Sequence, residues 1–314
     1  MLELAWRGIA ILHAGDKPPE VALKLAELLR GRGIAAYVFR NDALEMAWRC
    51  YDAIIFVEAI GGVVRLVCPL LRGKEEDPPV LVVERRGRYI VPLLGSHRGA
   101  NELARELAPL LGAEAVITTA VEDAGAAPAE IFERVMLCGM DAAARLLVNK
   151  ALKEGRRVCV RGRDPPAALR GYSQYGDQCD VVIDVGGQCA AVCCRPYDLF
   201  VGFGATSDAG AHEIVEAILG ALSEMGASLS QVRAVASIRP VVSEVAAALG
   251  VPGILLRLED LKNDECLSPS RAVEALGVPG VAEPAALAVA GRGGRLLYRK
   301  RARGRVTVAV AARL

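Results

Sequence analysis

Residues 8–39 read GIAILHAGDKPPEVALKLAELLRGRGIAAYVF, and this stretch predicts the fold class. It holds an apolar segment at Gly8–His13, apolar residues at helical spacing within Glu20–Arg30, and a β-branched and aromatic segment at Ile34–Phe39. This order is typical of a strand, a helix and a second strand. Strands that alternate with helices form a mostly parallel sheet covered on both faces, so we expect an α/β fold.

The same alternation continues through the first third of the chain. A third strand is predicted at Ala53–Val57, and an apolar helix that ends at Leu71 follows it. Pro79–Val83 and Tyr89–Leu93 are predicted to form a hairpin, and Ala100–Leu111 has the spacing of an amphipathic helix. These elements predict an N-terminal α/β domain over residues 1–120.

The rest of the chain divides into two further parts. Residues 121–197 combine a helical stretch, Ile131–Gly155, with short strands and a loop rich in Pro, Gly and Arg. Residues 198–314 return to alternating strands and helices, with a further helix expected from Ser270 and an antiparallel pair of strands at the end. We therefore expect two mostly parallel α/β domains joined by a small irregular middle domain.

Composition excludes several classes of protein. The chain has 314 residues, 53% of them hydrophobic, and a net charge of +1, which argues against disorder. Apolar runs are shorter than the roughly 20 residues of a membrane span, and the N-terminus lacks the pattern of a secretory signal, so a cytoplasmic protein is expected. Near-neutral charge argues against nucleic acid as a partner. Only 7 of the 38 basic residues are Lys, and this arginine bias fits either a polyanionic ligand or GC-rich coding.

The chain has nine cysteines and no CxxC pair, which makes a structural zinc site a weak prediction. Most of the cysteines are expected to be buried thiols, because an intracellular disulfide is expected only in a hyperthermophile. Whether the cluster from Cys179 to Cys194 forms disulfides is left open.

The strongest functional motif is LLGSHRGANE at residues 93–102, between a predicted strand and a predicted helix. Ligands bind at the carboxyl ends of strands in open α/β sheets, and glycine-rich backbone before a helix accepts anions. An imidazole exchanges protons near neutral pH, so His97 and Glu102 are the predicted catalytic residues. Predicted substrate-binding residues in this motif are Gly95, Ser96, Arg98, Gly99 and Asn101. In the alternative interpretation, the glycines only form a turn and Glu102 stabilises the helix N-terminus.

Two other glycine motifs follow predicted strands. Gly61 and Gly62 would let a ligand approach the backbone, and Arg65 is the one charge in an apolar helix; the alternative is an arginine that extends to solvent. Gly204 and Thr206 lie in a loop that resembles a dinucleotide-binding turn, but Ser207 stands where that turn needs a third glycine. An NAD site is therefore excluded, and an anion-binding turn remains. Arginines in the last predicted strands either steer a polyanion or protect a sheet edge.

Together these motifs resemble the cobalamin biosynthesis protein G family (CbiG), the cobalt-precorrin-5A hydrolases. The resemblance is carried by Gly61–Arg65, Pro69–Leu71, Asp77-Pro78, Leu93–Glu102, Val116–Ala120, Gly277–Leu287 and Gly304–Ala309. It implies an enzyme of anaerobic cobalamin biosynthesis that opens the δ-lactone of cobalt-precorrin-5A and releases acetaldehyde to give cobalt-precorrin-5B. It also implies a large tetrapyrrole substrate with many carboxylates, which suits Arg65 and Arg98. No cofactor and no protein-bound metal are implied, because the substrate carries the cobalt.

The chain departs from the family pattern in both outer domains, and the C-terminal departure places the expected chemistry in the first domain. Gly95-Ser96 reverses the usual Ser-Gly order, and Gly204-Ala205-Thr206 stands where the family often has Gly-Cys-Arg after the first C-terminal strand. The first domain keeps a candidate base in its loop, whereas the C-terminal loop does not.

Lactone opening needs a base to activate water, a group to stabilise the oxyanion and a protonated leaving oxygen. We predict His97 or Glu102 as the base, N–H groups around Gly99 with Arg98 at the oxyanion, and Arg65 at a peripheral carboxylate. Two alternatives remain: a non-catalytic corrinoid-binding or delivery protein, and a divergent α/β module that binds a sugar or nucleotide. No membrane partner is expected, and a homodimer is left open.

Overall fold

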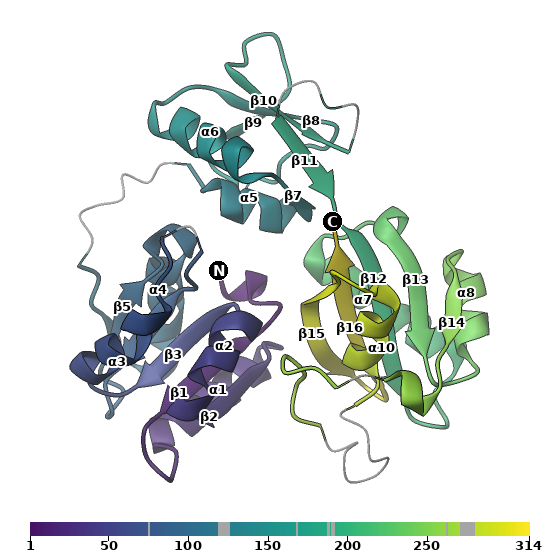
Figure 1. Ribbon diagram of the computed structural model, residues 1–314, viewed down its shortest axis with the longest axis horizontal. Helices are drawn as coiled ribbons and strands as arrows, with labels where there is room; N and C mark the ends of the chain where they lie inside the picture. The colour runs from purple at the N-terminus through teal and green to yellow at the C-terminus, as the bar shows by residue number, and fades with distance from the viewer. Residues whose placement is uncertain are drawn as a thin grey trace.

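The computed structural model describes residues 1–314 except 75, 119–125, 168, 187–188, 190–191, 262 and 271–279. Figure 1 shows three layered units, each built around its own sheet and helices. We call them the first, second and third units in chain order. The α/β fold class is confirmed. The boundary predicted between residues 120 and 121 lies outside the described residues.

The first unit has a six-stranded sheet in the order β2-β1-β3-β4-β5-β6. Its strands are β1 (Ile9–His13), β2 (Ala36–Arg40), β3 (Ala53–Val57), β4 (Val80–Val83), β5 (Tyr89–Leu94) and β6 (Glu114–Ala115). Its helices are α1 (Glu20–Gly31), α2 (Leu44–Cys50), α3 (Ile60–Val67) and α4 (Ala100–Leu111). Apolar residues of α1 and α4 pack in one core and those of α2 and α3 in another, so the sheet is covered on both faces as the pattern predicts.

The last two strands of the first sheet, β5 and β6, run against the other four. β5 pairs antiparallel with β4, with Leu94 opposite Val80, while Val80 is also level with Ile54 near the start of β3. The end of β5 therefore lies at the side of the sheet where β1, β3 and β4 begin, which we call the amino edge. The expectation that the loop after β5 lies at the carboxyl ends of the strands is wrong, because the hairpin reverses the chain direction.

The second unit is more regular than expected. Five strands form a sheet in the order β7-β11-β10-β8-β9, and only the β7–β11 pair is antiparallel. They are β7 (Cys138–Gly139), β8 (Val158–Arg161), β9 (Tyr172–Gln174), β10 (Val181–Val185) and β11 (Val192–Pro196), with helices α5 (Ala129–Met136) and α6 (Ala142–Lys153). The prediction of an irregular middle domain is wrong because β7 and β9 have only two and three residues, too few to show a period.

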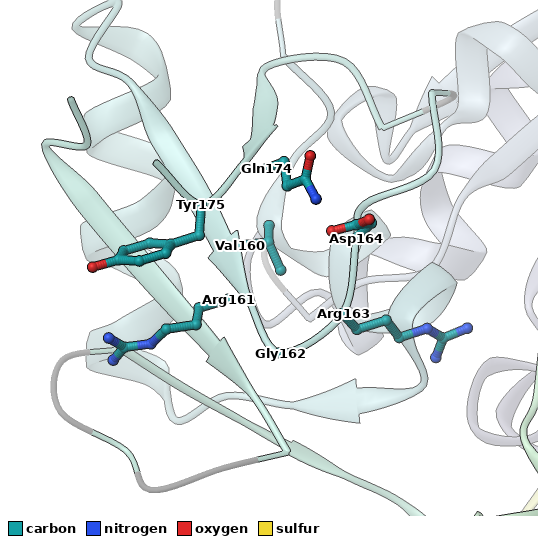
Figure 2. Close-up of a pocket in the computed structure, with 7 residues that line it drawn as sticks. All are labelled: Val160, Arg161, Gly162, Arg163, Asp164, Gln174 and Tyr175. Atoms are coloured by element: carbon teal, nitrogen blue, oxygen red, sulfur yellow. The ribbon is translucent and has the colours of Figure 1, made fainter. Parts of the chain in front are cut away.

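A pocket of about 450 Å³ lies at the carboxyl ends of β8 and β9 (Figure 2). Arg161 stacks on the Tyr175 ring at 5.1 Å and donates from Nη2 to Asp184 at 2.8 Å, so its charge is balanced locally. Arg163 points away from Gln174 in Figure 2 and donates to the carbonyl of Gly226 in the third unit. The pocket is thus polar but has no marked excess of charge.

The third unit has a sheet in the order β14-β13-β12-β16-β15. Its strands are β12 (Asp198–Ala205), β13 (Val232–Ser237), β14 (Gly253–Leu255), β15 (Arg295–Arg303) and β16 (Val306–Arg313), with helices α7 (Ala211–Met225), α8 (Val242–Leu249) and α10 (Ala282–Ala290). The predicted antiparallel pair at the end of the chain is confirmed as β15 and β16. The helix expected from Ser270 falls mainly on residues 271–279, outside the described part. No described helix is both long enough and apolar enough to cross a membrane.

Eight of the nine cysteines form disulfides, and Cys68 is free and exposed. The pairs are Cys50–Cys266, Cys138–Cys194, Cys159–Cys179 and Cys189–Cys193. Their Cα atoms are 5.0 to 5.8 Å apart, within the range that a disulfide requires. The expectation of mostly free thiols is therefore wrong, and the cluster from Cys179 to Cys194 is paired.

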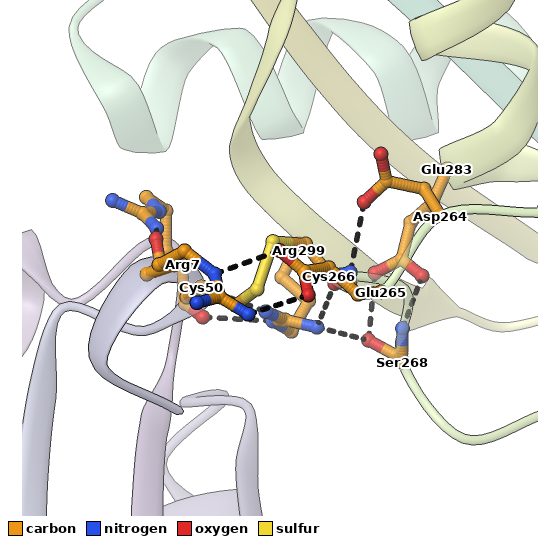
Figure 3. The surroundings of a disulfide bond; sticks show 9 residues. Arg7, Cys50, Asp264, Glu265, Cys266, Ser268, Glu283 and Arg299 are labelled. Carbon is orange, nitrogen blue, oxygen red and sulfur yellow. Dashed lines mark hydrogen bonds and ion pairs between the residues drawn. A yellow bond between two sulfur atoms is a disulfide. The ribbon is translucent and has the colours of Figure 1, made fainter. Parts of the chain in front are cut away.

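The first and third units are joined at Arg299, a fully buried residue of β15 (Figure 3). Its guanidinium donates to the carbonyl of Arg7 at 2.7 Å and to that of Cys50 at 2.9 Å, both in the first unit. It also donates at 2.7 Å to the carbonyl of Cys266, whose sulfur is bonded to that of Cys50. We call these four residues the Arg299 cluster. One cation and one covalent bond thus fix the two units to each other.

Removing the Cys50–Cys266 disulfide is expected to lower the free energy of unfolding by about 2–4 kcal/mol. The bond joins residues 216 apart, so its loss frees a long loop in the unfolded chain. The test is urea denaturation of the Cys50→Ser/Cys266→Ser double variant without reductant. Cys68→Ser is the control, because that thiol is exposed and unpaired. Equal denaturation midpoints for the two variants would contradict the prediction.

Candidate functional site

The loop from Gly95 to Glu102 joins β5 to α4 through a short 3₁₀ turn at Ser96–Arg98. Gly95 and Gly99 have φ angles of +78° and +89°, in the left-handed region that favours glycine. A Cβ on Gly95 would lie 2.8 Å from the Cα of Pro79, so the backbone approaches Pro79 closely. The glycines therefore form the turn, and the turn sets where His97 lies.

His97 and Glu102 flank the N-terminus of α4. His97 is exposed, and Glu102 lies in the first turn of the helix, 3.6 Å from Arg105. The carboxylate is 40% exposed and lies where the helix dipole favours negative charge. Ser96 is half-buried and Asn101 is buried beside them. The structure thus brings an imidazole and a carboxylate to one helix end, both within reach of a ligand.

The backbone N–H groups of the turn are used within the turn. Arg98 N donates to Gly95 O at 2.9 Å, and Gly99 N donates to Ser96 O at 3.1 Å. These groups are therefore engaged and are poorly placed to receive a developing oxyanion. The guanidinium of Arg98 is the better candidate for that role.

The loop faces the second unit. Burial lowers the pKa of Arg98, and the guanidinium of Arg134 on α5 lowers it further, whereas Glu130 and Asp52 raise it. Asp52 is 8% exposed at the amino edge, where it accepts a hydrogen bond from Arg7 N at 2.6 Å and forms an ion pair with Arg134. Asp52 and Arg134 have no signal in the sequence, because contacts between units leave no local pattern.

Gly61, Gly62 and Arg65 lie elsewhere. They belong to α3, which follows the carboxyl end of β3, and Arg65 Nη1 donates to Gly61 O at 2.8 Å. β3 has five residues, so this motif and the His97 loop are separated by about 15 Å along the strand. The structure does not bring the two motifs together, and substrate binding by Arg65 stays a prediction.

Gly204 and Thr206 lie at and after the end of β12 in the third unit. Arg239, which follows β13, donates to the carbonyls of Thr206 and Ser207, the latter at 3.0 Å. This loop therefore offers carbonyl oxygens to an arginine of the same unit. It lies in a different unit from His97, and its role as an anion-binding turn stays a prediction.

The carboxylate next to this loop titrates at unusually low pH. Hydrogen bonds from Thr206 and Arg305 lower the pKa of Asp208 to about 2, below the usual value of about 3.9. Because the folded-state pKa is lowered, the contribution of Asp208 to stability is present above about pH 4 and is lost as the pH falls through 2. In an NMR titration we expect Arg305→Gln to raise this pKa and the exposed control Arg292→Gln to leave it at about 2. A pKa that stays at about 2 in Arg305→Gln would contradict the assignment.

In the described part of the chain, Cys50, Glu265 and Cys266 are the group whose side chains could together hold a metal ion. Their sulfur and carboxylate oxygen atoms lie within 4.8 Å of one another. The two sulfurs are joined in a disulfide, so they are not thiolates, and Arg49 Nη2 donates to Glu265 at 2.7 Å. This group does not fit a cation in its oxidised form. That the protein binds no metal of its own stays a prediction.

A cavity of about 740 Å³ lies between the first and third units. It is lined by Leu2, Glu3, Arg32, Gly33, Ile34, Glu106, Pro109, Leu110, Glu224 and Arg301. Its volume is in the range of small-molecule sites. Arg301 is ion-paired with Glu224 at 3.0 Å, and none of the predicted site residues lines the cavity.

Comparison with known proteins places this geometry in a family. The model of the cobalamin synthesis G N-terminal domain matches residues 42–122, and that of the cobalamin synthesis G C-terminus matches residues 199–311. A curated cobalt-precorrin-5A hydrolase from Priestia megaterium is 28% identical over 305 residues, which cover 85% of this chain and 80% of the relative. A protein of the same name from Salmonella typhimurium is 43% identical over 100 residues, or 31% of this chain and 28% of the relative.

A solved structure of a related protein matches this chain over its full length. The crystal structure of a cobalamin biosynthesis protein G homologue from Sulfolobus solfataricus superposes with a TM-score of 0.86 at 28% identity, covering 100% of this chain and 99% of that one. The two family models together match more than half of the chain, and the His97 loop lies inside the first matched segment. This chain therefore belongs to the cobalamin biosynthesis protein G family.

Proposed function

We infer that this chain is a cobalt-precorrin-5A hydrolase of cobalamin biosynthesis. The observation that carries this conclusion is likeness along nearly the whole chain: the relative with this name covers 85% of it, and both family models match. The reaction would open the δ-lactone of cobalt-precorrin-5A and release acetaldehyde to give cobalt-precorrin-5B. The substrate brings the cobalt, so the reaction as proposed uses no cofactor held by the protein.

The His97 loop supports a hydrolytic mechanism. His97 or Glu102 would take a proton from water as its oxygen attacks the lactone carbonyl, and Arg98 would stabilise the oxyanion. Collapse of the tetrahedral intermediate breaks the ring C–O bond and gives a carboxylate and an alcohol. Loss of the alcohol proton then forms the aldehyde as the neighbouring C–C bond breaks, and the macrocycle carbon takes the electron pair and a proton. A base that accepts and returns a proton serves both steps.

The experiment is to incubate the purified chain with cobalt-precorrin-5A and trap the aldehyde with a hydrazine. The hydrolase proposal expects one acetaldehyde for each substrate consumed and the mass of cobalt-precorrin-5B. A corrinoid-binding or delivery protein would retain the tetrapyrrole at unchanged mass and yield no aldehyde. That outcome would overturn the proposal.

A further inference from the structure

The place where the first and second units meet at the amino edge is rich in arginine. Arg98 comes from the loop after β5, Arg134 from α5 and Arg145 from α6. Their acidic neighbours are Asp52, Glu130 and Glu133. We call these six residues the junction cluster. Figure 1 shows α5 on the side of the second unit that faces the other two, so the cluster lies between units.

The junction cluster keeps buried donors without an acceptor. Nε of Arg134 has no hydrogen-bond partner among the described residues. Nε of Arg145 has no hydrogen bond there either, although it forms an ion pair with Glu133 at 3.5 Å. The hydroxyl of Tyr172, a residue 9% exposed and next to Glu130 and Glu133, also lacks a partner there. Buried polar groups are normally paired, so donors that share one place point to an acceptor that binds from outside.

The electrostatics favour an anion as that acceptor. The side chain of Arg134 is 21% exposed, and Arg98 is half-buried near it. Burial of two neighbouring guanidinium groups is costly, and the lowered pKa of Arg98 reflects that cost. Burial also raises the pKa of Glu133, because the charged carboxylate loses hydration there. Asp52, Glu130 and Glu133 offset these three arginines, but Arg7 and Arg295 also act on the same groups. Positive charge therefore exceeds negative charge here, and an anion would relieve the repulsion.

We propose that the junction cluster binds carboxylate groups of the tetrapyrrole substrate, with Arg134 and Arg145 as binding residues of the second unit. This inference rests on the proposed function, because that function supplies a macrocycle with many carboxylates. Arginine pairs with carboxylates through two parallel N–H donors, so it suits this ligand better than lysine would. Since Arg98 follows His97 directly, a carboxylate held here places the rim of the macrocycle next to the predicted base.

The binding test uses a porphyrin octacarboxylate, uroporphyrin, and follows quenching of tryptophan fluorescence. We expect Arg134→Gln and Arg145→Gln each to raise Kd about tenfold, because each removes one charge-assisted contact. Arg233→Gln is the matched control, since Arg233 is exposed and pairs with Asp198 in the third unit at 2.6 Å. Melting curves show whether each variant is folded. Arg145 is the more exposed of the two arginines, so its variant tests the proposal if Arg134→Gln does not fold.

The kinetic test uses cobalt-precorrin-5A itself. Both variants are expected to raise KM about tenfold with little change in kcat. This is the result when a lost contact binds the substrate and the transition state equally. If folded Arg145→Gln binds the octacarboxylate as tightly as Arg233→Gln does, the junction proposal is wrong. If the wild type releases no acetaldehyde but binding still depends on Arg134 and Arg145, the proposed function fails and the carboxylate site stands. If the two variants release acetaldehyde with the KM of the wild type, the carboxylate site is wrong and the proposed function stands.

Discussion

Replacing His97 with Ala is expected to lower kcat for acetaldehyde release by about 10²–10⁴-fold, the usual contribution of a general acid–base residue. The imidazole is exposed at the start of α4, in a loop whose two left-handed glycines fix its position. Because its environment is open, substitution should leave the fold intact. The measurement is the rate of aldehyde formation at saturating substrate.

Glu102→Gln separates the two candidate bases. If Glu102 is the base, its variant loses activity by a similar factor while His97→Ala loses less; if His97 is the base, the order reverses. His212→Ala and Glu216→Gln are matched controls, because they remove an exposed imidazole and carboxylate 3.7 Å apart on α7. If both His97→Ala and Glu102→Gln release acetaldehyde at the wild-type rate, the assignment of the base to this loop is wrong.

Arg299→Met is expected to lower the free energy of unfolding by about 3–5 kcal/mol, the range seen when a buried charge partner is removed. The change leaves the carbonyls of Arg7, Cys50 and Cys266 without this donor, and each unsatisfied buried group costs about 1–3 kcal/mol. The cation also lies 4.2 Å from the centre of the Tyr51 ring, and that contact is lost as well.

The measurement is the urea denaturation midpoint with the disulfides intact. Arg292→Met is the control, because it makes the same chemical change at an exposed position. Equal midpoints for the two variants would show that Arg299 does not stabilise the contact between units. A drop confined to Arg299→Met supports the described network.

The sequence predicts the local elements of the outer units well. Ala53–Val57 and Ala100–Leu111 form with the predicted bounds, because the first is a continuous apolar run and the second has a helical period that ends at Gly112. The helix predicted after β3 to run to Leu71 is too long: α3 ends at Val67 and a 3₁₀ turn follows, because Pro69 has no N–H to continue the helical hydrogen bonds.

Less of the candidate site than of the fold can be predicted from the sequence. The motif at residues 93–102 is found from its glycines and its imidazole, but its place at the amino edge depends on the direction of β5, which periodicity does not reveal. Arg134 and Arg145 have no signal of their own, because they are ordinary helix residues until another unit packs against them. The disulfides share this property, since sequence spacing does not give the distance between Cα atoms.

The Arg299 cluster also sets an order of events during protein synthesis. Arg299 lies 249 residues after Cys50. At about 5–20 residues per second, a ribosome needs roughly 12–50 s to cover that distance. The first sheet can form early in this interval, while the carbonyls of Arg7 and Cys50 still lack their donor. A nascent chain stalled before residue 299 would therefore present an incomplete first unit to chaperones and proteases.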